Sequence, residues 1–350
     1  MANLLVTGGA GFIGGNFVHY WNARHPDDRV LVLDALTYAG NRSTLAGATN
    51  AELVTGDIRD TDLVERLLRE HAVTTLVHFA AESHVDRSIS GPDVFVDTNI
   101  LGTHSLLKAA RTVWLSGDGI EHRFHHISTD EVFGSLGPDD PAFTETTPYA
   151  PNSPYSATKA ASDHLVRAYH RTFGLHVTTS NCSNNYGPYQ YPEKLIPLFL
   201  LNALHGRVLP IYGDGMHVRD WLHVEDHCRG IEACLRRGQP GETYNFGGGT
   251  ALTNLDLVDA ICREVDRAFA ESDWLSARYP DAPAAHGVPT ASLKTHVPDR
   301  AGHDRRYAID DTRARNRLGY APACDLADGM HRTMHWYAAH EDWWRPLFKS

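Results

Sequence analysis

The first half of the chain alternates between short apolar runs and longer stretches in which apolar residues recur at helical spacing. The runs end near Thr7, Asp34, Asp57, Ala80 and Ser128. Short runs that are apolar throughout are typical of strands buried on both faces, and the stretches between them are typical of amphipathic helices. The pattern therefore predicts an α/β fold with a doubly wound parallel sheet between two layers of helices.

The same periodicity predicts the individual elements. Strands are expected at 4–7, 30–33, 52–54, 76–80, 124–127, 175–179 and 243–246, and helices at 16–21, 62–70, 94–111 and 155–172. Ligands of such sheets bind beyond the carboxyl ends of the strands, because the loops that follow the strands meet at one edge. The small and polar residues at these ends are therefore the first candidates for a binding site.

A glycine-rich turn follows the first strand. Gly8, Gly9, Gly11 and Gly14 satisfy both G-x-G-x-x-G and G-x-x-G-x-x-G. Such a turn brings a bare backbone close to a pyrophosphate, and the helix that follows adds free N–H groups and the positive end of its dipole. Strand, turn and helix together predict a dinucleotide-binding unit of the Rossmann type.

The second strand ends at Asp34, 20 residues after Gly14, and no arginine follows immediately. A carboxylate at this position accepts hydrogen bonds from the adenosine ribose and repels a 2′-phosphate. The predicted cofactor is therefore NAD rather than NADP.

Composition and charge limit the partners. The chain has 350 residues, which suggests about two domains, and 43 acidic against 32 basic residues give a formal charge of -11. This balance argues against nucleic acid or an anionic membrane as a partner. Five scattered cysteines without C-x-x-C argue against disulfides and zinc, and the absence of H-E-x-x-H gives a metal little support. With no leader and no apolar run of transmembrane length, a soluble cytoplasmic protein is expected.

Two groups of residues offer chemistry. Thr129, Asp130 and Glu131 follow the strand 124–127, and both carboxylates could reach one substrate from the loop there, although solvated acids in a turn are a common alternative. Tyr155 and Lys159, four residues apart, share one face of the predicted helix 155–172. A nearby ammonium, together with the positive nicotinamide ring, is expected to lower the pKa of the phenol and make it a usable base.

Nine segments spread in order over nearly the whole chain resemble the extended short-chain dehydrogenase/reductases, and among them the dTDP-glucose 4,6-dehydratase family. They are TGGAGFIG (7–14), DALTYAGN (34–41), AAESHVDRSI (80–89), ISTDEVFG (127–134), YSATK (155–159), NCSNNYGPYQYPEKLIP (181–197), LPIYGDG (209–215), VRDWLHVEDH (218–227) and DRAGHDRRYAID (299–310). The Thr-Asp-Glu sequence discriminates, because related sugar-nucleotide epimerases and decarboxylases lack the Asp-Glu pair there.

The resemblance implies a reaction on the nucleotide sugar dTDP-glucose. Tyr155 takes the proton of the 4-hydroxyl, Thr129 hydrogen-bonds the same oxygen, and NAD takes the hydride from carbon 4. Glu131 then acts as base at carbon 5 and Asp130 as acid on the 6-hydroxyl, so that water leaves before the hydride returns to carbon 6. Adjacent carboxylates can divide these roles if one of them is desolvated or feels its neighbour's charge.

The resemblance also implies the binding residues. The cofactor is expected to contact Gly8, Gly11, Phe12, Ile13, Gly14, Asp34, Leu36, Thr37, Asp57, Ile58, Ala80, Ala81, Glu82, Thr98, Tyr155, Lys159 and Asn185. The substrate is expected to contact Ser83, His84, Thr129, Asn184, Glu193, Lys194, Leu195, Pro210, Tyr212, Arg219, Asn254 and the segment Asp299-Arg300-Ala301-Gly302-His303. Arg219 is the main candidate for the diphosphate, with a local ion pair to Asp220 as the alternative.

The second half of the chain is less regular. We expect an NAD-binding domain over 1–181 with parts of 218–247, and a smaller, interleaved substrate-binding domain over the remainder of 182–350. The stretch 272–295 is rich in proline and alanine and extends beyond the family's pattern, which predicts a flap or a partly disordered excursion near the nucleotide end. Phe133 stands where the family usually has tyrosine.

Three functions remain open from the sequence. They are a dTDP-glucose 4,6-dehydratase, an NAD-dependent epimerase, decarboxylase or dehydratase acting on another nucleotide sugar such as UDP-glucose, and a regulator that binds NAD without catalysis. The resemblance further implies a homodimer in which helices 94–111 and 155–172 of two copies form a four-helix contact.

Overall fold

The alternating apolar runs form a seven-stranded parallel sheet. The computed structural model describes residues 2–116, 121–299 and 303–348. The strands of the sheet are β1 (Asn3–Thr7), β2 (Arg29–Asp34), β3 (Ala51–Thr55), β4 (Thr75–His78), β5 (Arg123–Thr129), β6 (Val177–Cys182) and β10 (Thr243–Phe246). Their order is β10-β6-β5-β4-β1-β2-β3, so the chain builds outward from β1 first toward β3 and then, from β4 on, toward β10.

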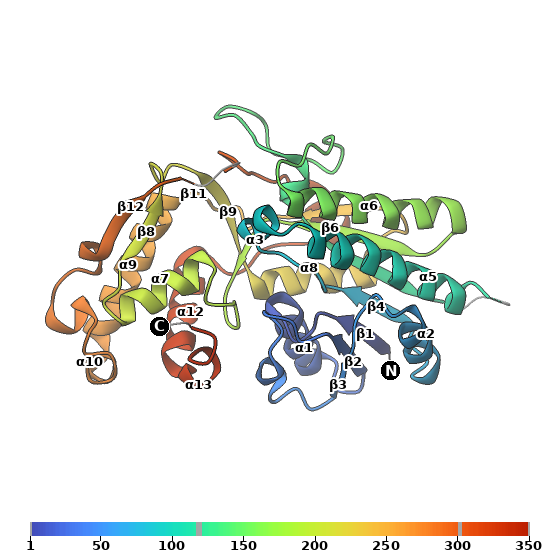
Figure 1. The fold of residues 1–350 in the computed structure, drawn as a ribbon, viewed down its shortest axis with the longest axis horizontal. Coiled ribbons are helices and arrows are strands. Elements are labelled where there is room, and N and C mark those ends of the chain that lie inside the picture. The colour runs from blue at the N-terminus through green and yellow to red at the C-terminus, as the bar shows by residue number, and fades with distance from the viewer. Residues whose placement is uncertain (1, 117–120, 300–302, 349–350) are drawn as a thin grey trace.

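Helices cover both faces of this sheet (Figure 1). Leu4 and Val6 of β1 pack with α1 (Phe12–Arg24) and α8 (Val224–Arg237). Leu5, which points to the opposite face, packs with α2 (Thr61–Glu70), α5 (Thr103–Trp114) and α6 (Pro154–Phe173). Because successive side chains of a strand alternate between faces, an entirely apolar strand needs both layers. The predicted doubly wound fold of the Rossmann type is confirmed.

Helix α6 has well-defined ends. Ser153 and Ser156 form a capping box, and Pro154 occupies the first turn, where it removes no intrahelical hydrogen bond. Gly174 ends the helix in the left-handed conformation at φ 76°. The helix therefore starts and stops where the sequence places its caps. This fixes which side chains of α6 lie beside the end of β5.

The helix predicted at 94–111 is continuous but changes its winding. It begins with α4 (Asp93–Phe95), passes through a π-helical segment at Val96–Gly102, and continues as α5. A Cβ atom on Gly102 would lie 2.5 Å from the Ile58 side chain, so a glycine allows the close approach of these elements. π-Helical turns are often found at functional sites.

A second lobe lies beside the carboxyl edge of the sheet (Figure 1). Its helices are α7 (Leu195–Leu204), α9 (Asn254–Glu271), α10 (Asp273–Arg278), α12 (Leu326–Ala339) and α13 (Glu341–Trp344). Two small sheets, β11-β9-β7 and β12-β8, are formed by β7 (Asn184–Tyr186), β8 (Leu209–Tyr212), β9 (Val218–His223), β11 (Ala251–Thr253) and β12 (Lys294–Val297). The remaining short helices are α3 (Val85–Ser90) and α11 (Thr312–Leu318).

The prediction for 272–295 is wrong. This stretch forms α10, two 3-10 turns and the start of β12. Leu275, Tyr279 and Ala282 are buried in the apolar core of the second lobe, and Arg278 forms an ion pair with Glu341 of α13. The sequence misled because the apolar residues are spaced irregularly among prolines, yet Leu275, Tyr279 and Ala282 join the core to which α9 and α12 also contribute.

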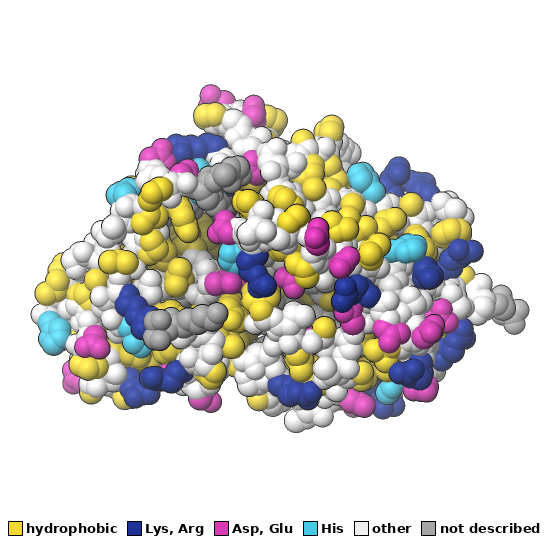
Figure 2. Space-filling model, in the orientation of Figure 1, with side chains coloured by type: hydrophobic (Ala, Val, Ile, Leu, Met, Phe, Trp, Pro, Cys, Tyr) yellow, Lys and Arg dark blue, Asp and Glu magenta, His cyan; other side chains and the backbone are white. Residues whose placement is uncertain are grey.

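Large apolar side chains also remain exposed on one face. Ile89, Val96, Leu101 and Phe173 belong to α3, the π-helical segment and α6, and between 37% and 52% of each is exposed. Figure 2 views the side of the molecule that carries α5 and α6, and hydrophobic side chains gather over these helices. Among the described residues, no helix has the length and apolar character needed to cross a membrane.

The packing of 272–295 can be tested by Leu275→Ala. This substitution removes a fully buried side chain, so we expect the free energy of unfolding to fall by about 2–5 kcal/mol in denaturant titrations. Val288→Ala is the matched control, because 46% of Val288 is exposed, and it should change stability by about 0.5 kcal/mol or less. Equal stability of the two variants would mean that the segment is a loose flap after all.

Candidate active site

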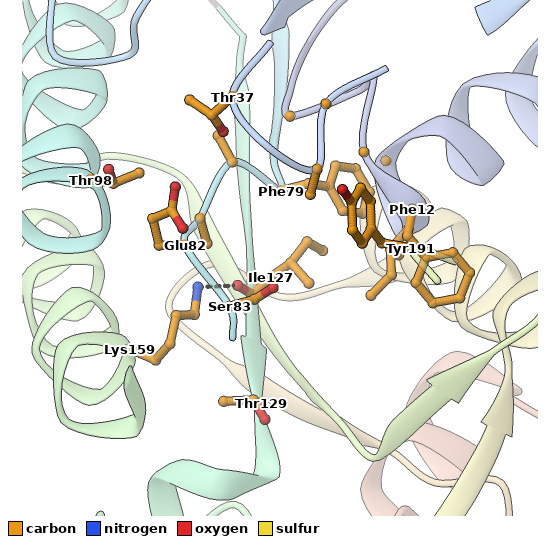
Figure 3. A pocket seen from close by; sticks show the side chains of 18 of the residues that line it. Phe12, Thr37, Phe79, Glu82, Ser83, Thr98, Ile127, Thr129, Lys159 and Tyr191 are labelled. Carbon is orange, nitrogen blue, oxygen red and sulfur yellow. Dashed lines mark hydrogen bonds between the residues drawn. The ribbon is translucent and has the colours of Figure 1, made fainter. Parts of the chain in front are cut away.

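A cavity of about 380 Å³ opens at the carboxyl edge of the sheet. Residues that directly follow β1, β2, β4 and β5 line one side of it, and residues that follow β6 line the other. Figure 3 shows Thr98 and Lys159 reaching the cavity from the helices, with Glu82 and Thr129 beside them. The site therefore lies where the strand ends of the sheet predicted it.

The glycine turn after β1 makes room for a ligand. Gly8 has φ 71°, and a Cβ there would lie 2.6 Å from the backbone nitrogen of Ala80. A Cβ on Gly14 would lie 2.4 Å from the Gly8 carbonyl oxygen. Any larger residue would close the turn and block the approach to the first N–H groups of α1, so the turn fits a pyrophosphate.

Asp34 closes the adenosine end of the cavity. Its two carboxylate oxygens accept hydrogen bonds from the backbone N–H groups of Ala10 at 2.9 Å and Leu36 at 2.8 Å. Burial raises the pKa of Asp34, and these two backbone donors oppose the rise. Leu36 itself, at φ 51°, does not line the cavity, and it contributes its N–H to Asp34 instead of its side chain to a cofactor.

Lys159 is held at the floor of the site. Its Nζ donates a hydrogen bond to the backbone oxygen of Ile127 at 2.7 Å, as Figure 3 shows. Tyr155 and Lys159 are both buried on the face of α6 that packs on β5. The pair thus lies beside the end of β5, one turn of helix apart.

The expected effect on Tyr155 does not arise from the chain alone. Burial, followed by the charge of Glu131, raises the pKa of Tyr155 well above 10, and a hydrogen bond from Thr129 opposes the rise only in part. Lys159 does not reverse this, because burial also lowers the pKa of the lysine and its ammonium is engaged by Ile127. Deprotonation of Tyr155 therefore requires a positive charge beyond that of Lys159.

The two carboxylates after β5 occupy different surroundings. Thr129 ends the strand, and its hydroxyl accepts a hydrogen bond from the backbone N–H of Glu131 at 3.3 Å, which starts the 3-10 turn Asp130–Phe133. Only 2% of Asp130 is exposed, and burial together with the charge of Glu131 raises its pKa well above 3.8. Burial therefore favours the protonated form of Asp130.

The free oxygen of Asp130 is available for chemistry. Among the described residues, Oδ2 of Asp130 is buried without a hydrogen-bond partner, while Oδ1 accepts a hydrogen bond from the Thr129 hydroxyl at 3.4 Å. A buried, protonated carboxyl group with one free oxygen can donate a proton to a ligand in the cavity. Asp130, Glu131 and Tyr155 all line this cavity, so one ligand can meet all three.

Most of the predicted site residues are brought together here. The cavity is lined by Gly8, Gly11, Phe12, Ile13, Gly14, Asp34, Thr37, Asp57, Ile58, Ala80, Ala81, Glu82, Ser83, Thr98, Thr129, Asp130, Glu131, Tyr155, Lys159, Asn184, Asn185, Glu193 and Lys194. His84 lies just outside it, with Nε2 3.6 Å from Glu193. Leu195 begins α7 behind this wall.

The other predicted substrate residues lie in the second lobe, outside the cavity. They are Pro210 and Tyr212 on β8, Arg219 on β9, Asn254 at the start of α9, and Asp299 and His303. His303 Nδ1 lies 2.7 Å from Asp299 Oδ1, and the rings of His303 and His217 stack at 3.5 Å. Residues 300–302 of the predicted segment lie outside the described residues.

Arg219 is held beside an aromatic ring. Its guanidinium donates to the backbone oxygens of Val218 and Asp304 at 2.8 Å each, and it lies over the Tyr307 ring at 4.2 Å. Asp220 accepts hydrogen bonds from the backbone N–H groups of Gly248 and Thr250 instead, at 2.9 and 2.8 Å. Asp220 therefore holds the loop after β10.

The sequence analysis missed two tyrosines of the cavity. The rings of Tyr38 and Tyr191 meet edge to face at 5.5 Å, and the Arg87 guanidinium lies over Tyr38 at 3.8 Å. Both tyrosines lie inside segments that resemble the family, at 34–41 and 181–197. Phe133, the departure from the family, is buried against Phe143 at 5.1 Å, which makes it a packing residue.

Groups that could hold a metal occur away from the cavity. In the described part of the chain they are His217 with Asp299 and His303, and Glu264 with His331 and His335. Glu264 is already engaged by the Arg267 guanidinium at 2.7 Å. Neither group lines the cavity that contains Tyr155 and Asp130.

A family model described as GDP-mannose 4,6 dehydratase matches residues 5–333 of the chain. The chain belongs to this family. Its predicted place among the extended short-chain dehydrogenase/reductases is confirmed. This family membership covers both lobes, because the matched residues extend from β1 into α12.

Individual relatives are similar over nearly the full length. The dTDP-glucose 4,6-dehydratase of Xanthomonas campestris pv. campestris is 53% identical over 98% of this chain and 95% of its own length. The crystal structure of DesIV, a dTDP-glucose 4,6-dehydratase from Streptomyces venezuelae with NAD bound, has a TM-score of 0.86 and 48% identity, covering 99% of this chain and 100% of that one. A UDP-glucose 4-epimerase from Thermotoga maritima has a TM-score of 0.81 at 27% identity, covering 96% of this chain and 99% of that one.

Gly8→Ala tests whether the glycine turn holds the dinucleotide. The methyl group would overlap the Ala80 backbone, so we expect the NAD content of the purified protein, measured after denaturation, to fall at least about tenfold. Gly249→Ala is the matched control, because Gly249 also has φ 71° but no atom lies within 4 Å of the added Cβ. If Gly8→Ala retains as much NAD as Gly249→Ala, the turn is not the binding element.

Proposed function

We propose that this protein is a dTDP-glucose 4,6-dehydratase, a hydro-lyase that converts dTDP-glucose into dTDP-4-keto-6-deoxyglucose and water in deoxysugar biosynthesis. The observation that carries this proposal is the carboxyl group of Asp130, which is buried in the same cavity as Glu131 and Tyr155 and whose Oδ2 has no hydrogen-bond partner among the described residues. Relatives that bear this name are 47–53% identical over nearly the whole chain. An acid for water loss, a second carboxylate and a redox base in one cavity are what this reaction needs.

NAD is the cofactor of this reaction. The glycine turn, Asp34 and the strand ends form a cavity that fits a dinucleotide, and the related DesIV was crystallised with NAD. When bound, NAD accepts the hydride from carbon 4 of the sugar and returns it to carbon 6. Because the hydride returns to the sugar, oxidised NAD is regenerated in each turnover, so the dinucleotide has no need to leave the site.

The oxidation of the sugar depends on α6 and the end of β5. Tyr155 takes the proton of the 4-hydroxyl, and Thr129 hydrogen-bonds the same oxygen. Burial and Glu131 keep the pKa of Tyr155 high in the chain alone. The phenolate therefore forms only when the site contains additional positive charge, so the base is switched on by assembly of the complete complex.

The loss of water depends on the two carboxylates. Glu131 removes the proton of carbon 5, which the new ketone has acidified, and Asp130 protonates the departing 6-hydroxyl. When the hydride reaches carbon 6, Glu131 returns the proton to carbon 5. Burial and the charge of Glu131 raise the pKa of Asp130, which favours Asp130 as the acid of the pair.

The nucleotide is held by the second lobe in this proposal. Arg219 binds the diphosphate, with Asn184, Glu193, Lys194 and Leu195 along the sugar and Pro210, Tyr212, Asn254, Asp299 and His303 toward the base. Two observations support Arg219 as the diphosphate ligand: its side chain is buried, and the Tyr307 ring lies against its guanidinium. Both hold in one orientation a group whose geometry matches phosphate oxygens. The choice of thymidine rests on the names of the relatives with the highest identity.

An epimerase shares the fold but not the need for an acid. The related UDP-glucose 4-epimerase has the same architecture at 27% identity. Epimerisation at carbon 4 requires a redox base but no proton for a leaving hydroxyl, and a buried protonated Asp130 has no task in it. Incubation with dTDP-glucose separates the functions: a dehydratase forms a 4-keto-6-deoxy sugar with alkali-induced absorbance, an epimerase a galacto sugar, and a regulator neither.

We also propose the remaining organisation from the sequence and the fold. The NAD-binding domain comprises 1–181 with parts of 218–247, because β10 pairs with β6 in the first sheet and α8 packs on that sheet. The substrate-binding domain takes the remainder of 182–350. We place the protein in the reducing cytoplasm, and its five free cysteines agree with this location. Two copies pair through α5 and α6 and their flanking segments, where apolar side chains are exposed.

Asp130→Asn separates the two halves of the reaction. Without the acid, we expect kcat for the keto sugar to fall by about 10²–10⁴, while NADH still accumulates on mixing with dTDP-glucose. Tyr155→Phe is the contrasting variant and should abolish both NADH formation and product. Water loss at the wild-type rate in Asp130→Asn would show that another group is the acid.

The dimer is tested by Leu101→Glu. Leu101 is 52% exposed on the proposed contact, so a charge there should convert a wild-type dimer of twice 38.8 kDa into a monomer in light scattering at micromolar concentration. Val208→Glu is the control, since Val208 is 58% exposed but lies before β8, far along the chain from these helices. A monomeric wild-type protein would contradict the proposal.

A further inference from the structure

A third polar side chain continues the row of Tyr155 and Lys159 along α6. Asp163 follows Lys159 by four residues, so it lies on the same face of the helix one turn further from the cavity. It is buried with 6% exposed, and it does not line the cavity. A buried carboxylate is costly for a folded protein, so its retention requires a compensating role.

Asp163 joins three elements that surround the catalytic residues. Its Oδ2 accepts hydrogen bonds from the Ser128 hydroxyl at 2.8 Å and the Tyr149 hydroxyl at 2.9 Å. Its Oδ1 lies 3.0 Å from Nε2 of His126. Because a carboxylate can only accept, Nε2 of His126 carries the hydrogen. The three donors come from β5 and from the loop that follows the Asp130–Phe133 turn.

The charge of Asp163 acts on Lys159. Burial lowers the pKa of Lys159, and Asp163 is the largest influence that opposes this change. In return, Lys159 is the largest influence that holds down the pKa of Asp163, which burial raises to about 6. The two groups are therefore an electrostatic pair, although the Lys159 ammonium makes its hydrogen bond to Ile127.

We propose that Asp163 is a positioning residue of the dehydratase reaction, which keeps Lys159 charged and fixes the end of β5 that carries Thr129, Asp130 and Glu131. It touches neither substrate nor cofactor and acts through Lys159 and Ser128. This role rests on the proposed function, in which Lys159 supports proton removal by Tyr155. It goes beyond the Tyr155–Lys159 pair by assigning the lysine its counter-charge.

The groups around Asp163 determine in which direction its charge changes the pKa of Lys159. Lys159 and His164 face it from α6, His126 and Ser128 from β5, and Tyr149 from the loop. His126 is neutral, since burial and Lys159 lower its pKa well below 6.5. Asp163 is thus the negative group among these neighbours, and it is ionised above about pH 6. Removing its charge must lower the pKa of Lys159.

Asp163→Asn tests the role in the oxidation step. We measure the rate of NADH formation on mixing with dTDP-glucose as a function of pH. In Asp163→Asn the fall of this rate at alkaline pH, the alkaline limb of the profile, should begin about one pH unit lower than in the wild type, because Lys159 loses its proton at a lower pH. The KM for dTDP-glucose should change little, since Asp163 lies outside the cavity. Asp163→Glu, which restores the charge, should return the limb toward its wild-type position.

Tyr149→Phe is the matched control. It removes one hydrogen bond from the same cluster but leaves the Asp163 charge in place at alkaline pH. Its alkaline limb should coincide with that of the wild type, even if its rate is lower. If the alkaline fall of the rate occurs at the same pH in Asp163→Asn and in Tyr149→Phe, Asp163 only supports the local structure, and the proposal is wrong.

A second measurement does not depend on the folding of Asp163→Asn. Coupling is reciprocal, so Lys159→Met should raise the pKa of Asp163 above its wild-type value near 6 by about one unit, observed by NMR of ¹³C-labelled aspartate. An unchanged Asp163 titration would overturn the proposal. This titration needs no substrate, so it remains informative if the wild type forms no keto sugar, a result that would refute the proposed function instead.

Discussion

The packing of α6 against β5 is the constraint on which the active site depends. Helix α6 presents Tyr155 and Lys159 to the end of the strand, and all of these groups are almost fully removed from water. The low polarity of this contact strengthens each charge interaction and penalises each unpaired charge. Proton positions at the site are therefore decided by which groups are buried together, and small displacements of α6 would change them.

Burial gives two neighbouring carboxylates different tasks. Asp130 is almost fully buried in the wall of the cavity, where desolvation and the negative charge of Glu131 raise its pKa. The same desolvation keeps Tyr155 protonated in the chain alone. Burial thus raises the pKa of a carboxyl group and of a phenol that line the same cavity.

The two lobes contribute unequal parts of one site. The sheet lobe supplies the glycine turn, Asp34 and the catalytic residues, which lie on strand ends and a capped helix with little freedom to move. The second lobe supplies Arg219 and the wall at Asn184, Glu193 and Lys194. Its C-terminal end is tied back to the first lobe by the hydrogen bond from Trp343 to Thr44.

The sequence by itself determined the parallel sheet, the glycine turn and the acid of the second strand, because apolar periodicity and glycine spacing are local properties of the chain. It also placed Thr129, Asp130, Glu131, Tyr155 and Lys159 at one end of the sheet. Only the tertiary structure decided that the pKa of Asp130 is raised, that Lys159 is engaged by Ile127 and faces Asp163, and that Leu275, Tyr279 and Ala282 of 272–295 pack in the core. These properties depend on burial by segments distant in the sequence, and desolvation cannot be read from neighbours along the chain.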